Sequence, residues 1–465
     1  MLIDEQWPVA RLIPISSASG VEAQERRAAS ALLAVIGAVP EFAYALLKPL
    51  GAHKGKVRTF IEVPFKLAGR SIRPDGIIAV ARGNKTWTAI VETKVGAAAL
   101  EPAQIDVYLD LARELQVDAV LSISNHYVTS STQYPVEVDR RKVKRVALHH
   151  WSWVDVLTEA VVQKEHRGVS DPDQAYILDE LIRYMSDRRS GVLTFEGMGP
   201  AWTKVRDGAR DGTLRKNDDE VAVVAARWDD LVRYVGLELT KLLGRDVKQV
   251  LPKEERTPAA RQTALRESLA NRGVLYAEVA VPDTSGAIEI AADLRARQVS
   301  VATRLGAPRQ GRSKGRVSWL LRQLHDAPEN LTVEARLGRG QSLASSLAKL
   351  RETPETLYPD ASKEVRQFAL TLTRNMGVKR DASKGSFVDS VLTTTQEFYT
   401  QVLQNLRPWK PAPPRAKQAA PSAELGVEET VVLPDGVADA VDRAQDEQEA
   451  QQPGDAASES AILPS

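Results

Sequence analysis

The chain of 465 residues contains no cysteine. Disulfide bonds and zinc sites built on thiolates are therefore excluded, and a reducing compartment such as the cytoplasm is the simplest expectation. No apolar run approaches the roughly 18 residues that a membrane-spanning helix needs. The first residues include Asp4 and Glu5 and show no basic and then apolar leader, so we expect neither a signal peptide nor a membrane partner.

The chain also has almost no net charge, but this balance conceals an asymmetry. Residues 411–465 contain eleven acidic and three basic residues, so this segment carries −8 of a total of +1 and the remainder carries +9. The segment is rich in Pro, Ala, Glu and Gln and poor in aromatic residues, which predicts a disordered acidic tail. A basic body is compatible with a nucleic-acid partner, and a solvated surface explains the same charge equally well.

Turn-forming residues divide the rest of the chain. Gly191, Gly197, Gly199 and Pro200 separate residues 1–190 from a second region, 201–410. That region shows helical and strand-like patterns in alternation, which predicts an α+β domain whose role no motif identifies. Its expected elements include helices over 218–243, 342–351 and 387–406 and strands over 274–281, 288–294 and 299–303.

The most informative stretch of the sequence runs from Val57 to Tyr108. Arg73-Pro-Asp-Gly76 precedes one apolar run, and Thr88-Ala-Ile-Val-Glu-Thr-Lys94 is a second apolar run with two charges at its end. The turn residues Gly83 and Asn84 lie between these runs and predict a hairpin, which brings Asp75 and Glu92 side by side. Because side chains at i and i+2 share a face of a strand, Glu92 and Lys94 project together.

Two carboxylates and a lysine on adjoining strands suit phosphodiester hydrolysis. Hard cations such as Mg²⁺ take oxygen ligands, commonly one or two carboxylates together with phosphate and water. A metal held in this way activates water and neutralises developing charge, and Lys94 can orient the water or stabilise the transition state.

Two flanking helices carry further polar candidates. Ser19 to Glu22 fits a capping box for a helix that reaches about Gly37, and Glu25 falls on the apolar face of this helix, where burial is costly unless it is paired. In the helix expected over 100–115, Gln104 and Tyr108 share a face because they are four residues apart. After it we expect strands over 118–124 and 143–148 and a helix capped by Ser152.

These residues together resemble the PD-(D/E)xK nuclease superfamily, which has the restriction-endonuclease-like fold. The resemblance rests on Pro74-Asp75, on Glu92-Thr93-Lys94 and on Gln104 with Tyr108, and it covers roughly residues 15 to 165. It implies an α/β mixed-sheet core of order αβββαβ in residues 1–190. It also implies a nuclease that uses Mg²⁺, with Mn²⁺ as an alternative ion, and DNA as the expected substrate.

The same resemblance assigns roles to single residues. Asp75, Glu92 and the main-chain carbonyl of Thr93 are the expected metal ligands, and Lys94 assists the attacking water. Glu25 and Gln104 are expected as supporting residues of the site. The process served, whether restriction, repair or defence, stays open, as do RNA as substrate and a homodimeric state.

Other readings of the chain also stay open. The protein could be a binding or regulatory protein that kept the fold and lost turnover, or a sensor or assembly protein whose main role lies in residues 201–410. In that region the basic residues Arg309, Arg312, Lys314 and Arg316 occur with glycines and without intervening acids, which predicts a basic loop suited to phosphate contacts. A solvated loop is the alternative.

Overall fold

The computed structural model describes residues 4, 6–13, 20–96, 98–127, 134–192, 195–360, 363–379 and 382–410. The acidic segment 411–465 and the expected cap residue Ser19 lie outside the described residues. The prediction of a disordered tail therefore stays a prediction.

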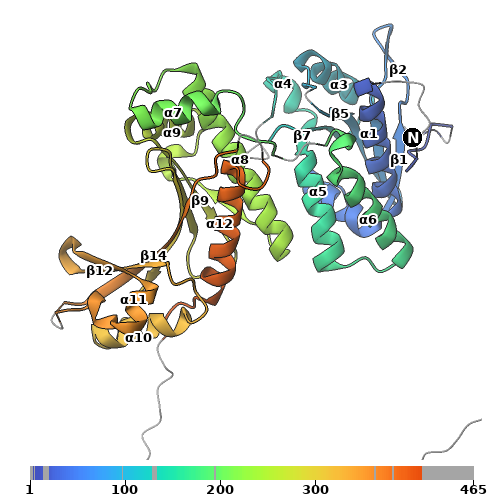
Figure 1. Cartoon of the computed structure of the whole chain (residues 1–465). Helices are drawn as coiled ribbons and strands as arrows, with labels where there is room; N and C mark the ends of the chain where they lie inside the picture. The colour runs from blue at the N-terminus through green and yellow to red at the C-terminus, as the bar shows by residue number, and fades with distance from the viewer. Residues whose placement is uncertain are drawn as a thin grey trace, which may run out of the picture. The chain divides into compact units, whose positions relative to one another are not determined.

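A mixed five-stranded sheet organises the first part of the chain (Figure 1). In spatial order its strands are β1 (Lys56–Ile61), β4 (Gly76–Arg82), β5 (Lys85–Thr93), β6 (Ala119–Ser124) and β7 (Ala147–Ser152). The first three strands are antiparallel to one another, whereas β5, β6 and β7 are parallel. The predicted hairpin is confirmed as β4–β5, with Arg82 paired to Lys85 across the turn.

Both faces of this sheet are buried because its central strands are continuous apolar runs, and successive side chains of a strand point to opposite faces. Ile78 and Val91 belong to one core and Ile77 and Ile90 to the other. The first core is covered by α1 (Gly20–Ala38), α2 (Pro40–Leu47), α5 (Trp153–Val162) and α6 (Pro172–Ser186). The second core is covered by α3 (Pro102–Glu114), which also forms the crossover between the parallel strands β5 and β6 (Figure 1).

Two details near this sheet differ from the sequence prediction. A small hairpin, β2 (Phe65–Leu67) with β3 (Arg70–Ile72), follows β1 and precedes β4 along the chain, and it was not expected. The strand predicted over 143–148 is instead β7, Ala147–Ser152, preceded by the short helix α4 (Arg140–Val143). The reason is the cap at Asp139, whose side chain accepts the Arg141 N–H and starts a helical turn in place of a strand.

The second part contains an antiparallel seven-stranded sheet. In spatial order its strands are β13 (Ser342–Ser346), β12 (Thr332–Leu337), β14 (Val365–Asn375), β11 (Gln298–Gly306), β10 (Ile288–Asp293), β9 (Val274–Ala280) and β8 (Lys248–Val250). Its helices are α7 (Trp202–Asp211), α8 (Asp219–Leu243), α9 (Pro258–Arg272), α10 (Ser313–Gln323), α11 (Leu347–Glu352) and α12 (Phe387–Gln401). The chain is thus a mixed α/β protein with several sheets.

The long helix α8 follows its apolar stripe, and Gly244 ends it with φ of 64° in the left-handed region, as a C-terminal glycine does. The prediction of a helix over 342–351 was wrong in its first half. Ser342–Ser346 pairs with β12 as the edge strand β13, and Ser346 then caps α11 by accepting the Lys349 N–H. The helices α7 and α9 were not predicted from the sequence.

The buried apolar side chains divide between residues 192 and 195. Both cores of the first sheet use residues up to Val192, and the core of the second sheet begins at Phe195. The helices α5 and α8 nevertheless pack against each other, and Met1–Lys410 forms one compact unit.

In the part of the chain that the structure describes, no single helix has both the length and the apolar character to cross a membrane. Among the described residues, one pair of helical segments, Gly20–Ala38 and Pro40–Leu50, meets those two criteria when taken together, and the pair is bent by 109° at its junction.

Candidate active site

The hairpin β4–β5 brings Asp75 and Glu92 together. Gly76 pairs with Val91 across the two antiparallel strands, so Asp75, one residue before β4, lies beside Glu92 near the end of β5. The Oδ2 atom of Asp75 accepts hydrogen bonds from the Thr93 N–H at 2.7 Å and from the Thr93 hydroxyl at 2.8 Å. These two bonds, which the sequence did not predict, fix the carboxylate against β5.

Lys94 joins this pair from the same strand. Its Nζ lies 2.7 Å from Oε1 of Glu92, as expected for side chains at i and i+2. Glu25 of α1 approaches from another element, with its Oε2 3.6 Å from the same Nζ. The structure therefore brings Glu25, Asp75, Glu92 and Lys94 to one place.

Burial sets the electrostatics of the cluster. Desolvation, reinforced by the neighbouring Asp75, raises the pKa of Glu92 to about 7. Desolvation likewise raises the pKa of Asp75, against hydrogen bonds from Thr93 and the charge of Lys94. It also raises the pKa of Glu25, against the charge of Lys94. For Lys94, burial lowers the pKa, but the charge and hydrogen bond of Glu92 outweigh it, so the pKa of this ammonium is raised.

The two residues expected from α3, Gln104 and Tyr108, lie one behind the other at the site, with Tyr108 nearer to Glu92. The Gln104 Nε2 donates to the Tyr108 hydroxyl oxygen at 3.0 Å, and Tyr108 lies near enough to the Glu92 carboxylate to lower its pKa. Gln104 thus reaches the acidic pair through Tyr108. Burial and the charge of Glu92 raise the pKa of Tyr108, so its hydroxyl keeps its proton and can donate to Glu92.

The donor set fits a hard divalent cation. Glu92 is 1% exposed, so its carboxylate is almost fully removed from water. Among the described residues, Oδ1 of Asp75 has no hydrogen-bond partner. Asp75 raises the pKa of Glu92, and the single ammonium of Lys94 compensates the two carboxylates only in part, so a divalent ion would supply the further positive charge.

The candidate metal ligands are the two carboxylates of Asp75 and Glu92, and the Thr93 carbonyl is expected as a third. No ready-made group of three or more Asp, Glu or His side chains with metal-binding spacing occurs among the described residues. The Thr93 side chain is fully buried and its N–H and hydroxyl are used by Asp75. Its carbonyl as a ligand stays a prediction.

Sequence reasoning missed one contact in the site. The indole N–H of Trp153 donates to the main-chain carbonyl of Lys94 at 2.8 Å. The signal that could have found it is the position of Trp153 directly after the cap residue Ser152, because a first-turn side chain of α5 faces the adjacent strand end.

The four basic residues expected to contact nucleic acid are placed differently from one another. Arg309, Arg312 and Lys314 are exposed and form no ion pair with another described residue. Arg316 is 4% exposed, and its guanidinium donates to the Val365 carbonyl at 2.7 Å and to Glu364 at 2.6 Å. Arg316 is therefore a structural residue of α10, and the predicted basic loop ends where this helix begins, at Ser313.

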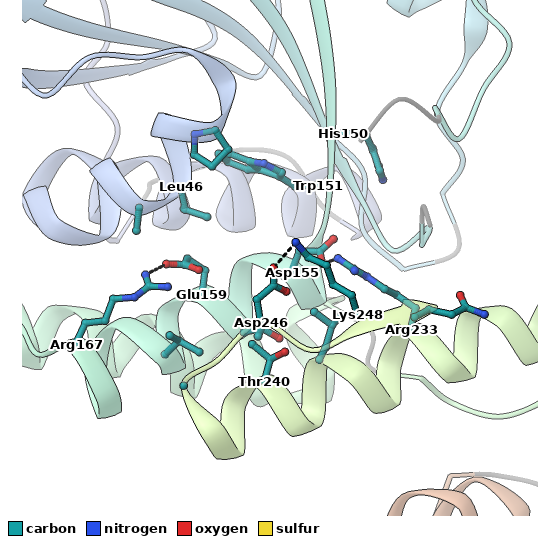
Figure 2. A pocket seen from close by; sticks show the side chains of 17 residues that line it. Leu46, His150, Trp151, Asp155, Glu159, Arg167, Arg233, Thr240, Asp246 and Lys248 are labelled. Atoms are coloured by element: carbon teal, nitrogen blue, oxygen red, sulfur yellow. Dashed lines mark hydrogen bonds and ion pairs between the residues drawn. The ribbon is translucent and has the colours of Figure 1, made fainter. Parts of the chain in front are cut away.

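A separate cavity of ≈ 610 Å³ lies where α5 and α8 meet and contains none of the candidate active-site side chains. Figure 2 shows Leu46 and Trp151 on one side of it and charged residues such as Asp246 and Arg233 on the other. His150 also lines this cavity, and its Nδ1 lies 2.9 Å from the Ser122 hydroxyl. Burial lowers the pKa of His150 to about 4.

No protein-family model, curated protein or solved structure matches the chain.

Proposed function

We propose that the protein is a metal-dependent nuclease that hydrolyses phosphodiester bonds, with DNA as the expected substrate. The observation that carries this proposal is the convergence of Asp75, Glu92, Lys94 and Glu25 at one end of a mixed sheet. The strand order β1-β4-β5-β6-β7, with three antiparallel strands followed by parallel ones, agrees with the restriction-endonuclease-like core that the resemblance implies. This agreement supports the proposal.

Asp75 through its Oδ1, Glu92 and the Thr93 carbonyl would hold Mg²⁺ or Mn²⁺. Such an ion polarises the scissile phosphate and lowers the pKa of a bound water. Metal binding needs both carboxylates ionised, so the raised pKa of Glu92 links binding to pH near neutrality.

Lys94 acts as a cation in this scheme and not as a base. Its raised pKa keeps the ammonium protonated, so it donates hydrogen bonds to the attacking water or to the phosphoryl oxygens where negative charge develops. Glu25 is the one carboxylate of this cluster that is not assigned to the metal. Its raised pKa and its place 3.6 Å from the Lys94 Nζ suit it to accept a proton from a water that Lys94 orients.

Arg309, Arg312 and Lys314 are proposed to hold the phosphate backbone, since such contacts need exposed positive charge and little else. A role in restriction, repair or defence follows only from the resemblance. A binding protein without turnover is the competing proposal, and the complete set of Asp75, Glu92 and Lys94 argues against it.

The deciding experiment is incubation of the full chain with supercoiled plasmid and with linear DNA, in Mg²⁺, in Mn²⁺ and in EDTA. Cleavage is expected with either metal and not with EDTA. An RNA of the same sequence, tested in parallel, decides the substrate class. Binding without cleavage in every metal would reject the nuclease and favour the binding protein.

A further inference from the structure

The main chain of Lys94 is held from two sides. Its N–H donates to the Ile123 carbonyl of the neighbouring strand β6 at 2.8 Å. Its carbonyl accepts the indole N–H of Trp153 at 2.8 Å. Lys94 lies one residue beyond the end of β5, so β6 holds its N–H, and the Trp153 bond satisfies its carbonyl in place of a strand partner.

Trp153 is itself fixed where α5 begins. Its side chain is fully buried, and it follows the cap residue Ser152. The Ser152 hydroxyl accepts the Asp155 N–H at 3.1 Å, while Oδ2 of Asp155 accepts the Ser152 N–H at 3.1 Å and its hydroxyl at 2.7 Å. This reciprocal capping box sets the direction in which the first turn of α5 presents the indole.

The other oxygen of Asp155 leads into the second part of the chain. Its Oδ1 accepts a hydrogen bond from Nη2 of Arg233, a residue of α8, at 2.7 Å. Both oxygens of one carboxylate are therefore used, one for the cap of α5 and one for α8. A second contact, from His166 to the Lys241 carbonyl at 2.8 Å, joins the helical turn that follows α5 to the last turn of α8.

We propose that Trp153 is a positioning residue for Lys94, and that α8 holds it in place through the Arg233–Asp155 pair. The inference rests on the proposed function for its meaning in catalysis, although the contacts themselves do not depend on it. It gives residues 201–410 a task at the candidate site, because α8 stabilises the helix start that orients the indole. Tryptophan suits this position since its ring fills the core while its N–H donates one bond.

The pair is also accessible. Asp155 and Arg233 both line the cavity of Figure 2, and their side chains are 22% and 28% exposed. The Nε of Arg233 is buried without a hydrogen-bond partner among the described residues.

The test replaces Trp153 by Phe, which keeps an aromatic ring and removes the N–H. Trp151→Phe is the matched control, because Trp151 lies two residues earlier and no hydrogen bond of its indole is present among the described residues. We expect Trp153→Phe to slow single-turnover cleavage at saturating DNA about 3- to 10-fold, the effect of one lost hydrogen bond, with the Kd for DNA in EDTA unchanged. Trp151→Phe should leave the rate unchanged.

Arg233→Met tests the second half of the proposal. Because it acts through the same hydrogen bond, the double variant with Trp153→Phe should be no slower than the slower single variant. If the rate losses of the two single variants multiply in the double variant, α8 acts by another route, and this half of the proposal is overturned. An unchanged rate in Trp153→Phe, or an equal loss in Trp151→Phe, would overturn the first half.

A readout that needs no cleavage separates this proposal from the nuclease. Amide hydrogen exchange of the peptide that spans residues 93–96 should become faster in Trp153→Phe and in Arg233→Met, and not in Trp151→Phe. If the wild type cleaves no nucleic acid but exchange follows this pattern, the nuclease proposal fails and the positioning contact stands. If the wild type cleaves DNA and exchange is unchanged in all three variants, the positioning proposal fails alone.

Discussion

Asp75 and Thr93 are joined by two hydrogen bonds across the end of the β4–β5 hairpin, and the same pattern recurs at Thr88, in the middle of β5. There Oδ2 of Asp118 accepts the Thr88 N–H at 2.7 Å and the Thr88 hydroxyl at 3.2 Å. The local bonding of the two carboxylates is alike, but only Asp75 has Glu92 and Lys94 beside it. Asp118 is therefore an internal control for what Asp75 does beyond fixing a threonine.

Asp75→Asn is expected to abolish cleavage while Asp118→Asn leaves it intact. Asparagine keeps an oxygen that can accept the Thr93 bonds but removes the charge that a metal needs. The measurement is the initial rate of plasmid cleavage in Mg²⁺, with the melting temperature of each variant recorded beside it. Equal activity of the two variants would show that Asp75 is only a turn residue.

Lys94→Ala is expected to slow cleavage by at least about 100-fold, because a preorganised donor to developing charge is lost. Lys85→Ala is the control, since Lys85 is an exposed lysine at the other end of the same strand. Both rates are measured at saturating DNA. A loss of stability as large as the loss of activity would mean that Lys94 serves the fold and not the reaction.

Glu92→Gln should stabilise the metal-free protein increasingly as pH rises. The pKa of Glu92 is about 7 in the folded chain and 4.5 ordinarily, so between these values the unfolded chain has lost a proton that the folded chain retains. The free energy of unfolding of the wild type therefore falls as pH rises through this window, by roughly 3 kcal/mol from this group, and glutamine removes the dependence.

Urea denaturation in EDTA at pH 5 and pH 8 measures this difference. Glu114→Gln, at the exposed end of α3, is the control. It should change the free energy of unfolding by the same amount at both pH values. A gap between Glu92→Gln and wild type that does not change with pH would contradict the raised pKa of Glu92.

Mg²⁺ should raise the melting temperature of the wild type more at pH 8 than at pH 5.5. At the lower pH Glu92 carries a proton and cannot bind a cation, and a ligand that binds only the folded state stabilises it in proportion to occupancy. The measurement is a thermal melt with and without the ion, in the absence of DNA. Asp75→Asn should show no metal-dependent shift at either pH, and Asp118→Asn should behave as wild type.

Replacing Arg309, Arg312 and Lys314 together by Ala should weaken DNA binding without regard to sequence. Each lost phosphate contact flattens the slope of log K against log salt by about 0.9, so the triple variant should lose about two to three units of slope. Binding is measured in EDTA over a range of salt. The exposed residues Arg215, Lys253 and Arg256, replaced in the same way, are the control, and an equal effect in both triples would show general charge and no DNA-holding surface.

Arg316→Ala should instead destabilise the fold, by about 2–3 kcal/mol, because several main-chain carbonyls lose their buried donor. Arg312→Ala, four residues earlier and exposed, should change the free energy of unfolding by less than about 0.5 kcal/mol. Chemical denaturation of the two variants decides between these roles. If both variants are as stable as wild type, the contacts of Arg316 carry no stability.

Local patterns predicted much of this structure. The hairpin turn at Gly83 and Asn84, the cap at Ser152 and the end of α8 at Gly244 depend on residues near one another in the chain, and each appears in the fold. Edge strand β13 was missed because its pairing with β12 is a tertiary choice, and its short serine-rich stretch has weak preference for either state.

The candidate site divides in the same way. The sequence by itself determined that Asp75, Glu92 and Lys94 share one hairpin end, since strand periodicity and a tight turn leave no other arrangement. Only the tertiary structure decided that Glu25 reaches Lys94, that Trp153 holds its carbonyl and that Arg316 is buried where Arg312 is not. Those contacts join residues up to 69 positions apart in the chain, Glu25 to Lys94. Their distances depend on how helices pack on the sheet, and no local pattern encodes that packing.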